Sequence, residues 1–346
     1  MVISVLDARD LPPAVTGAWS ELQSSEPTLA SPFFRPEFTQ AVAAARRDVG
    51  VGVLAGGGFF PFQRVRIGIG LPVGSRLSDY HGLVAPPETD VDALVLMKAC
   101  RLSTWEFDGL VAAQRAFRPF HRVERSSPVI DLAGGYDAYT ASRRGAGSDQ
   151  LDDAEKQAER LSRRVGPIHF EPHVADRAAL DRLLAWKSAQ YASTGAVDIF
   201  RFRWVDELVR RLHATSEPEF AGLLSVLYAA GQPVAMHLGL KSASVLHSWL
   251  PAYDPEFARY SPGIVLLARM ARSAPELGLV AIDLGKGDAL YKRRFANSAI
   301  ALAGGAVERP SLAAVMRAVE GASTRVLRHT PARALASRAL TRRRLR

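Results

Sequence analysis

The chain has 346 residues, of which 48% are hydrophobic and 23% charged, a composition typical of a soluble globular protein long enough for two domains. No run approaches ~18 consecutive apolar residues, so the sequence predicts no membrane span. The net charge is +9, but residues 311–346 contain nine arginines and one glutamate, and the first 310 residues therefore carry only about +1. This excludes a basic nucleic-acid-binding groove over the body of the chain, because such a groove needs many phosphate contacts and stacking aromatics.

The first 139 residues are predicted to form one lobe. Residues 11–23 and 35–47 have helical periodicity, and the segments VGVLAGG and FFPFQRVRIGI that follow read as two strands separated by a glycine turn. A helix over 90–102, the strand WEFDGL, a helix over 112–117 and the strand SPVIDL complete this lobe. Residues 140–150 combine charge, glycine and serine without periodicity, and we interpret them as a linker.

A second lobe is predicted over residues 150–310. Three helical segments (LDDAEKQAERLSRRVG, ALDRLLAWKSAQY and residues 204–212) precede the strands GLLSVLYA, PVAMHLGL and VLHSWLPAY, whose short turns predict an antiparallel meander. A helix from Pro262 to about Glu276, the strand LVAIDL, the helix ALYKRRF and the strand SAIALA follow. A strand, a helix and a further strand in this order predict a right-handed parallel crossover, so the fold class is α/β with a mixed sheet.

The segment ARYSPGIVLL predicts an anion-binding helix start. Ser261 is suited to the N-cap, Pro262 to the first helical position, and Gly263 leaves room for a ligand to approach the backbone amides. Free N–H groups and the helix dipole at such a start favour a pyrophosphate. An ordinary well-capped helix is the alternative interpretation.

The segment IDLGKGDALYKRRF predicts a strand that ends at Asp283, a sharp glycine exit, and a helix capped by Asp288 that carries Tyr291 and Lys292. A tyrosine at the opening of the sheet is suited to protonate a departing thiolate. The alternative is a tyrosine packed under the sheet. The glycines match neither a Walker loop nor a dinucleotide fingerprint, so ATP and NAD are not expected.

Four residues are candidates for a general base: His237, His247, Asp254 and Asp79. His237 and His247 lie on adjacent predicted strands, and a hairpin centred on Ser242 would place them opposite one another. The alternative interpretation, which we favour for a lone histidine, is that both are ordinary core or surface residues. No metal is expected, because Pro172 interrupts the only helical His-x-x-x-His spacing, at His169 and His173.

These segments carry a family resemblance. The sequences AYDPEFARYSPGIVLL and GLVAIDLGKGDALYKRRF, together with SDYHGLV, VIDLAGGYDAY and LLAWKSAQY, resemble the CelD/BcsL-type acetyltransferases, a branch of the GNAT superfamily associated with cellulose and exopolysaccharide production. The architecture is also similar to that of the Fem-type peptidyl transferases, which carry an aromatic-Lys pair like Tyr291-Lys292. The resemblance covers most of residues 15–300. It departs from the usual GNAT donor loop, where Arg259-Tyr260-Ser261-Pro262-Gly263 replaces the pattern of Gln or Arg followed by glycines.

The resemblance implies two tandem GNAT-like lobes, of which the first is degenerate and the second catalytic. The expected reaction transfers an acyl group, acetyl above all, from acyl-coenzyme A to an amine on an amino sugar, polysaccharide or cell-envelope precursor. The alternatives are a Fem-like transferase that uses aminoacyl-tRNA, and a non-catalytic scaffold of an exopolysaccharide synthesis complex. The residues expected to bind the cofactor are Tyr260, Ser261, Pro262, Gly263 and Ile264, and those expected to bind the substrate are Tyr80, Lys187, Tyr191, Tyr253, Asp283 and Lys292.

The sequence also predicts where the protein acts. The start MVISVLDARDLPP has no secretory signal, and the single cysteine, Cys100, cannot form an internal disulfide, so we expect a cytoplasmic protein. The basic tail, residues 311–346, is predicted to be helical or disordered. Its arginines and the apolar Leu335, Ala339 and Leu340 are compatible with peripheral contact to an anionic membrane.

Overall fold

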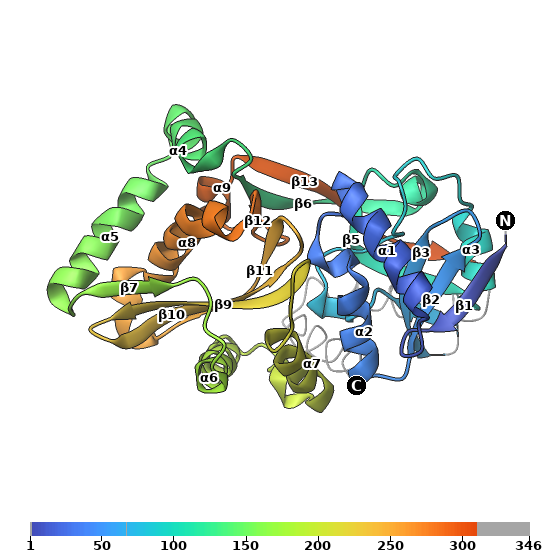
Figure 1. Cartoon of the computed structure of the whole chain (residues 1–346), viewed down its shortest axis with the longest axis horizontal. Helices are drawn as coiled ribbons and strands as arrows, with labels where there is room; N and C mark the ends of the chain where they lie inside the picture. The colour runs from blue at the N-terminus through green and yellow to red at the C-terminus, as the bar shows by residue number, and fades with distance from the viewer. Residues whose placement is uncertain (1, 67, 310–346) are drawn as a thin grey trace, which may run out of the picture.

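The computed structural model describes residues 2–66 and 68–309. Two lobes share one sheet, whose twelve main strands follow the order β1-β2-β3-β4-β5-β13-β6-β12-β11-β10-β9-β7, with the short β8 paired to β9. Figure 1 shows the first lobe on the right, the second on the left, and β6 and β13 running between them. No helix within these residues is long and apolar enough to cross a membrane.

The first lobe contains most of its predicted elements in order, but β1 was not predicted and the predicted strand FFPFQRVRIGI is divided into β3 and β4. Its strands and helices are β1 (Ile3–Asp7), α1 (Pro13–Ser25), α2 (Pro36–Ala45), β2 (Val49–Leu54), β3 (Phe59–Arg66), β4 (Ile69–Leu71), α3 (Ala93–Ala99), β5 (Thr104–Val111) and β6 (His121–Asp131). The helix predicted over 112–117 is wrong, because Pro119 lies in a 3-10 segment, η4 (Arg115–Phe120). The linker also differs from the prediction, since α4 (Gly135–Gly145) extends through half of it.

The second lobe contains the predicted meander and crossover. Its elements are α5 (Gln150–Arg164), β7 (Ile168–Glu171), α6 (Arg177–Thr194), α7 (Arg203–His213), β8 (Ser216–Glu217), β9 (Phe220–Ala229), β10 (Gln232–Lys241), β11 (Val245–Tyr253), α8 (Pro262–Ser273), β12 (Ala281–Asp283), α9 (Leu290–Phe295) and β13 (Ser298–Glu308). Strands β9, β10 and β11 are antiparallel, and β11 and β12 are parallel. The mixed α/β fold is confirmed.

The lobes exchange their last strands. Strand β6, at the end of the first lobe, pairs with β12 of the second, and β13, at the end of the second lobe, pairs with β5 of the first. The two exchanged strands also pair with each other over Ser298–Gly305. Each half of the sheet is therefore completed by the other lobe, which fixes the lobes against one another.

Apolar side chains fill both faces of this sheet. One core lies beneath α1, α2, α6 and α7 and spans both lobes, with Trp19, Phe38, Leu183, Leu208 and Met236 among its members. A second core lies under α5, α8 and α9, and a third lies around α3 in the first lobe. In the second lobe, α6 and α7 thus pack on the first of these cores, and α8 and α9 pack on the second.

Candidate functional site

Strands β11 and β12 separate after three residues. Their parallel register runs only from Val245 opposite Ala281 to His247 opposite Asp283, while β11 continues to Tyr253. A bulge at Trp249 contributes to the bend, because Leu238 of β10 pairs with Leu250 whereas Gly239 pairs with Ser248. We call the opening between residues 248–253 and the chain after Asp283 the notch. Its position at the carboxyl ends of two parallel strands is where open α/β sheets bind ligands.

Helix α8 begins beside the notch, but its start differs from the predicted cap. Ser261 has a left-handed backbone (φ 48°), and its side chain makes no capping hydrogen bond. Its carbonyl instead accepts from the N–H groups of Ile264 and Val265, at 2.9 and 3.3 Å. Pro262 occupies the first helical position as predicted. The serine therefore shapes the entry to the helix through its backbone, and its hydroxyl is not used as a cap.

The surface over this helix start is open. A Cβ placed on Gly263 would have only the Tyr253 ring within 4 Å, at 3.7 Å. Tyr253 is 45% exposed, so an aromatic ring borders the helix start on the side of the notch. Tyr260, by contrast, is buried in the second-lobe core between the guanidinium groups of Arg160 and Arg259, and only its backbone can face a ligand.

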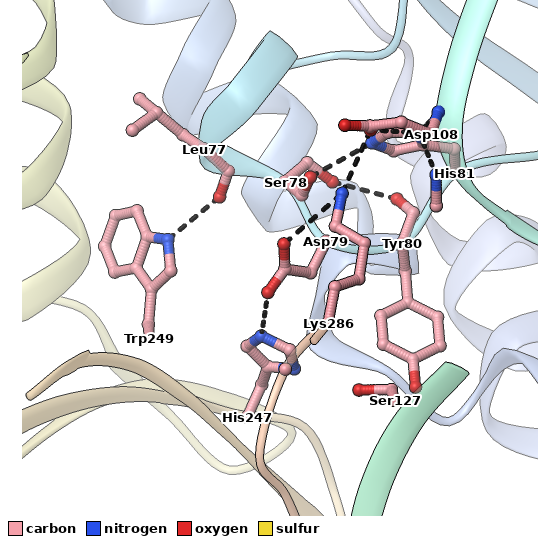
Figure 2. A network of polar contacts seen from close by, with 12 residues as sticks. Leu77, Ser78, Asp79, Tyr80, His81, Asp108, Ser127, His247, Trp249 and Lys286 are labelled. Atoms are coloured by element: carbon pink, nitrogen blue, oxygen red, sulfur yellow. Dashed lines mark hydrogen bonds and ion pairs between the residues drawn. The ribbon is translucent and has the colours of Figure 1, made fainter. Parts of the chain in front are cut away.

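A buried polar cluster joins the two lobes at the inner end of the notch (Figure 2). His247 of the second lobe contacts Asp79 of the first, with 3.0 Å between Nε2 and Oδ2. Its other nitrogen, Nδ1, lies 3.5 Å from Oδ1 of Asp283, an ion-pair distance without a hydrogen bond. The imidazole is fully buried between the two carboxylates.

This arrangement decides the protonation state of His247. Burial alone would lower its pKa, but the charge of Asp283 and the contacts with Asp283 and Asp79 outweigh burial and raise the pKa to about 9. The pKa of Asp79 is lowered, because its hydrogen bond to His247 and the nearby charges outweigh its burial. The pKa of Asp283 is also lowered, because the charge of His247 outweighs the effect of burial. Near neutral pH the cluster is thus an imidazolium between two carboxylates.

Hydrogen bonds from both lobes complete the shell around Asp283. Tyr80 and Ser127 donate their hydroxyls to its carboxylate, and the backbone N–H of Gly285 donates at 2.8 Å. Burial and the charge of Asp283 raise the pKa of Tyr80 well above its usual value. Tyr80 was expected to bind substrate, but it is buried and satisfied here, so it positions Asp283 instead.

Two lysines hold the turn after β12. Nζ of Lys292, a residue expected to bind the substrate, donates to the carbonyls of Gly285 and Lys286, at 3.0 and 2.9 Å, and so supports the turn. Gly285 has φ +75°, and a Cβ there would lie 2.8 Å from Oδ2 of Asp79. Nζ of Lys286 lies 3.0 Å from Oδ1 of Asp108 and 3.4 Å from Oδ1 of Asp79. The glycine lets the turn approach the first lobe closely enough for this contact.

Tyr291 lies in α9, half-buried against the second core, and burial raises the pKa of its hydroxyl. The helix begins after Ala289, and no side-chain cap is present, so the predicted cap by Asp288 is wrong. Asp254 receives the N–H of Glu256 at 3.0 Å and caps the 3-10 segment η6 (Pro255–Tyr260) at the end of β11.

The predicted pairing of the two histidines is wrong. The hairpin is centred beyond Ser242, so His247 lies opposite Leu240 and His237 opposite Pro251. His237 is buried and contacts Oγ of Ser248 at 3.0 Å through Nε2, and burial lowers its pKa to about 3. It is therefore neutral.

Two residues expected to bind the substrate lie on α6. Nζ of Lys187 donates to Gln190 at 2.9 Å and lies 5.4 Å from the centre of the Tyr191 ring.

The equivalent opening in the first lobe is filled by its own chain. Strands β4 and β5 are parallel over Ile69–Gly70, as β11 and β12 are in the second lobe. Beyond that point the SDYHGLV segment lies along β5: His81 forms a parallel bridge with Leu110, and its N–H donates to the carbonyl of Gly109 at 2.8 Å. A side chain at Gly109 would collide with the Asp79 carbonyl. We call this segment, residues 78–84, the plug. It fills the space beside β5 and places Asp79 next to His247 of the second lobe.

Sequence reasoning did not select Lys286, Asp108, Ser127 or His81. Lys286 is one of six lysines in an arginine-rich chain and stands between two glycines, a signal that could have identified it. His81 belongs to the SDYHGLV segment. Its Nδ1 accepts the N–H groups of Asp108 and Gly109, and Nε2 meets the Ser78 carbonyl at 3.0 Å, which assigns the proton to Nε2. Ser127 and Asp108 carry no local signal.

The comparisons with known proteins agree with this geometry. Residues 150–293 match the acetyltransferase (GNAT) domain family. None of the curated proteins matches the chain. Three solved structures share the fold: FemX (TM-score 0.60, 10% identity, 92% of this chain and 100% of that one), a conserved protein of unknown function from Bacteroides thetaiotaomicron VPI-5482 (0.60, 10%, 89% and 100%), and the C-terminal domain (DUF2156) of a putative lysylphosphatidylglycerol synthetase from Agrobacterium fabrum (0.55, 11%, 89% and 96%). At these identities the likeness is one of fold.

Proposed function

We propose, from the GNAT acyltransferase domain that residues 150–293 form, that this chain transfers an acyl group from acyl-coenzyme A to an amine acceptor. The observation that carries the proposal is the notch: two parallel strands that separate after His247, with an unobstructed helix start beside them at Gly263. An extended thioester arm fits between separated strands, and a pyrophosphate is suited to a helix start. The open helix start favours an enzyme over a non-catalytic scaffold, for which a blocked start is expected.

The donor would lie along residues 248–253 with its pyrophosphate at Ser261–Ile264 and its thioester near the Tyr291 hydroxyl. The neutral amine nitrogen attacks the thioester carbonyl, and the tetrahedral intermediate then expels the thiolate, which takes its proton from Tyr291. The nitrogen gives up the proton that the amide does not keep, and this proton returns through water to the Tyr291 oxygen and restores the hydroxyl. Burial raises the pKa of Tyr291, so the hydroxyl holds its proton until negative charge develops on sulfur. Holding amine and thioester in line supplies most of the acceleration.

The electrostatics of the cluster narrow the choice of base. His247 is already protonated at neutral pH, and the pKa of Asp79 is low, so neither accepts a proton readily. Asp79 is instead suited to orient the acceptor through its ammonium group, because its side chain is 25% exposed and stays ionised. The acceptor amine then loses its proton to water before it attacks.

The acceptor would approach between the lobes, past Lys187 and Tyr191 of α6. Burial lowers the pKa of Lys187, and its ammonium meets an amide oxygen and an aromatic face rather than a carboxylate. A sugar ring with polar or anionic substituents matches these two side chains. An amino sugar of a polysaccharide or cell-envelope precursor, as in the CelD/BcsL-type resemblance, is the acceptor we propose.

Calorimetry with two variants of one residue tests the donor site. Gly263→Glu places a carboxylate at the helix start, and we expect coenzyme A affinity to fall at least tenfold through bulk and like charge. Gly263→Ala is the matched control and should bind within a few-fold of wild type, because the site has room for a methyl group. Equal affinity of the folded glutamate variant and wild type would exclude this helix start as the donor site. Acyl-coenzyme A that copurifies with the protein, identified by mass spectrometry, would name the acyl group.

A further inference from the structure

Lys286 occupies the mouth of the interlobe cluster. Its ammonium bridges two carboxylates of the first lobe, at 3.0 Å from Asp108 and 3.4 Å from Asp79 (Figure 2). Lys286 is 18% exposed, Asp108 59% and Asp79 25%, so solvent reaches this contact, whereas His247 is fully buried. The ion pair is therefore at the surface that an acceptor entering between the lobes would meet first.

The backbone that carries Lys286 is fixed while its side chain is free to leave. Gly285 and Gly287 have φ values of +75° and +115°, a conformation that suits glycine, and Lys292 holds the carbonyls of Gly285 and Lys286 from within the turn. Rotation about the four-carbon stem of Lys286 would uncover both carboxylates without any change in the turn. Asp108, which makes the shorter of the two contacts, is 59% exposed, and ion pairs open to solvent are worth about fivefold in an equilibrium constant, so we expect another ammonium to exchange with Lys286.

The charges around the two carboxylates show what would replace this lysine. Asp79 keeps His247 as a partner, but Asp108 faces His81, whose pKa is lowered to about 4 by burial and by the charge of Lys286, so His81 is neutral. Without Lys286, Asp79 would keep only His247, which it shares with the buried Asp283, and Asp108 would have no cationic partner among the side chains that the structure describes. The site would then lack a positive charge at a position where a primary ammonium already fits.

We propose that the ammonium of Lys286 occupies the subsite for the acceptor's amine in the resting protein, and that the acceptor carries a cationic primary amine which displaces it from Asp79 and Asp108. This inference rests on the proposed function, since it names the acceptor class for the same site. Lys286 is thereby an internal competitor of the substrate. It also provides a positive charge between the two carboxylates when no acceptor is bound.

Lysine-selective NMR tests the displacement directly, because the chain has only six lysines, at positions 98, 156, 187, 241, 286 and 292. In ¹⁵N-lysine-labelled protein, the ammonium signal absent from Lys286→Arg belongs to Lys286. Titration with propylamine or glucosamine should shift this signal, whereas 1-propanol or N-acetylglucosamine at the same concentration should not. A Lys286 signal that both amines leave unchanged would overturn the proposal, as would an equal shift with the uncharged partners.

Affinity in variants provides the second measurement. Lys286→Met removes the competitor and should bind glucosamine about fivefold more tightly than wild type, with N-acetylglucosamine unchanged. Lys286→Arg keeps the charge and should show no gain, and Asp108→Asn in the methionine background should abolish it. Equal glucosamine affinity of wild type and folded Lys286→Met would contradict the inference. Coenzyme A binding, measured on the same samples, separates the outcomes: its absence from wild type would refute the donor site, whatever the lysine results.

Discussion

The buried imidazolium of His247 should make the stability of the chain depend on pH above neutrality. Its pKa is raised from 6.5 to about 9 in the folded chain, so below pH 6.5 the folded and unfolded states both hold the proton and the full contribution is present. Between pH 6.5 and about 9 only the folded state keeps the proton, and the free energy of unfolding falls by about 1.4 kcal/mol per pH unit. The whole contribution, about 3 kcal/mol, is lost once the pH has risen through the folded pKa.

Urea unfolding of wild type and His247→Gln at pH 6 to 10 measures this contribution. At pH 6 the glutamine variant should be less stable by about 3 kcal/mol or more, since it leaves the buried Asp283 without its cation and Asp79 with Lys286 alone, and the difference should shrink towards pH 10. Asp79 and Asp283 have lowered pKa values, so their own contribution is lost only as the pH falls in the acid range, outside this window.

His237→Gln is the matched control for this experiment. His237 is equally buried, but its pKa is lowered from 6.5 to about 3, so it is neutral in the folded chain throughout the range. Only its unfolded state takes up a proton, below about pH 7, so the effect of His237→Gln should be constant from about pH 7.5 to 10, where that of His247→Gln changes most. The reasoning fails if the difference between wild type and His247→Gln is constant from pH 6 to 10. It fails equally if His237→Gln shows the same slope, because the pH dependence would then not come from an imidazolium held by carboxylates.

Two further predictions concern the chemistry and the tail. Tyr291→Phe should bind coenzyme A as wild type does but turn over about 10²-fold more slowly with its acceptor, and the alkaline limb of the wild-type pH–rate profile should disappear; full activity with an unchanged limb would remove Tyr291 from the mechanism. Residues 330–346, outside the described part of the chain, should promote flotation with anionic liposomes in low salt, and equal recovery of full-length and truncated protein would contradict a membrane role.

Local sequence signals were sufficient for most of the fold. Short turns between apolar runs predicted the β9–β11 meander, and Pro262 marked the start of α8. The exchange of β6 and β13 between the lobes was not predictable in this way, because both strands carry ordinary strand patterns and their partners lie far away in the chain. The histidine register was missed for a related reason: a longer hairpin connection and the Trp249 bulge shift the pairing, and neither has a strong local signal.

The sequence identified several residues of the polar cluster, but it did not predict what each of them does. Asp79, Tyr80, His247 and Asp283 were each selected from sequence, and the structure brings all four together. Their roles depend on burial and charge supplied by both lobes, which a linear sequence does not display. His247 is an acceptable base at its ordinary pKa, but between two carboxylates it becomes a fixed cation.

The plug (residues 78–84) has two effects: it closes the first lobe beside β5, and it supplies side chains to the polar cluster of the second lobe. Because SDYHGLV bridges β5 at Leu110, the first lobe has no opening between β4 and β5 like the notch between β11 and β12, where we propose that the thioester arm lies. In the same segment, Asp79 contacts His247 and Tyr80 donates to Asp283. The segment can lie this close to β5 because Gly109 has no side chain. A substitution that freed the plug would therefore open the first lobe only by withdrawing Asp79 and Tyr80 from the second. The polar cluster beside the proposed donor site therefore draws side chains from both lobes, and neither lobe holds the full set alone.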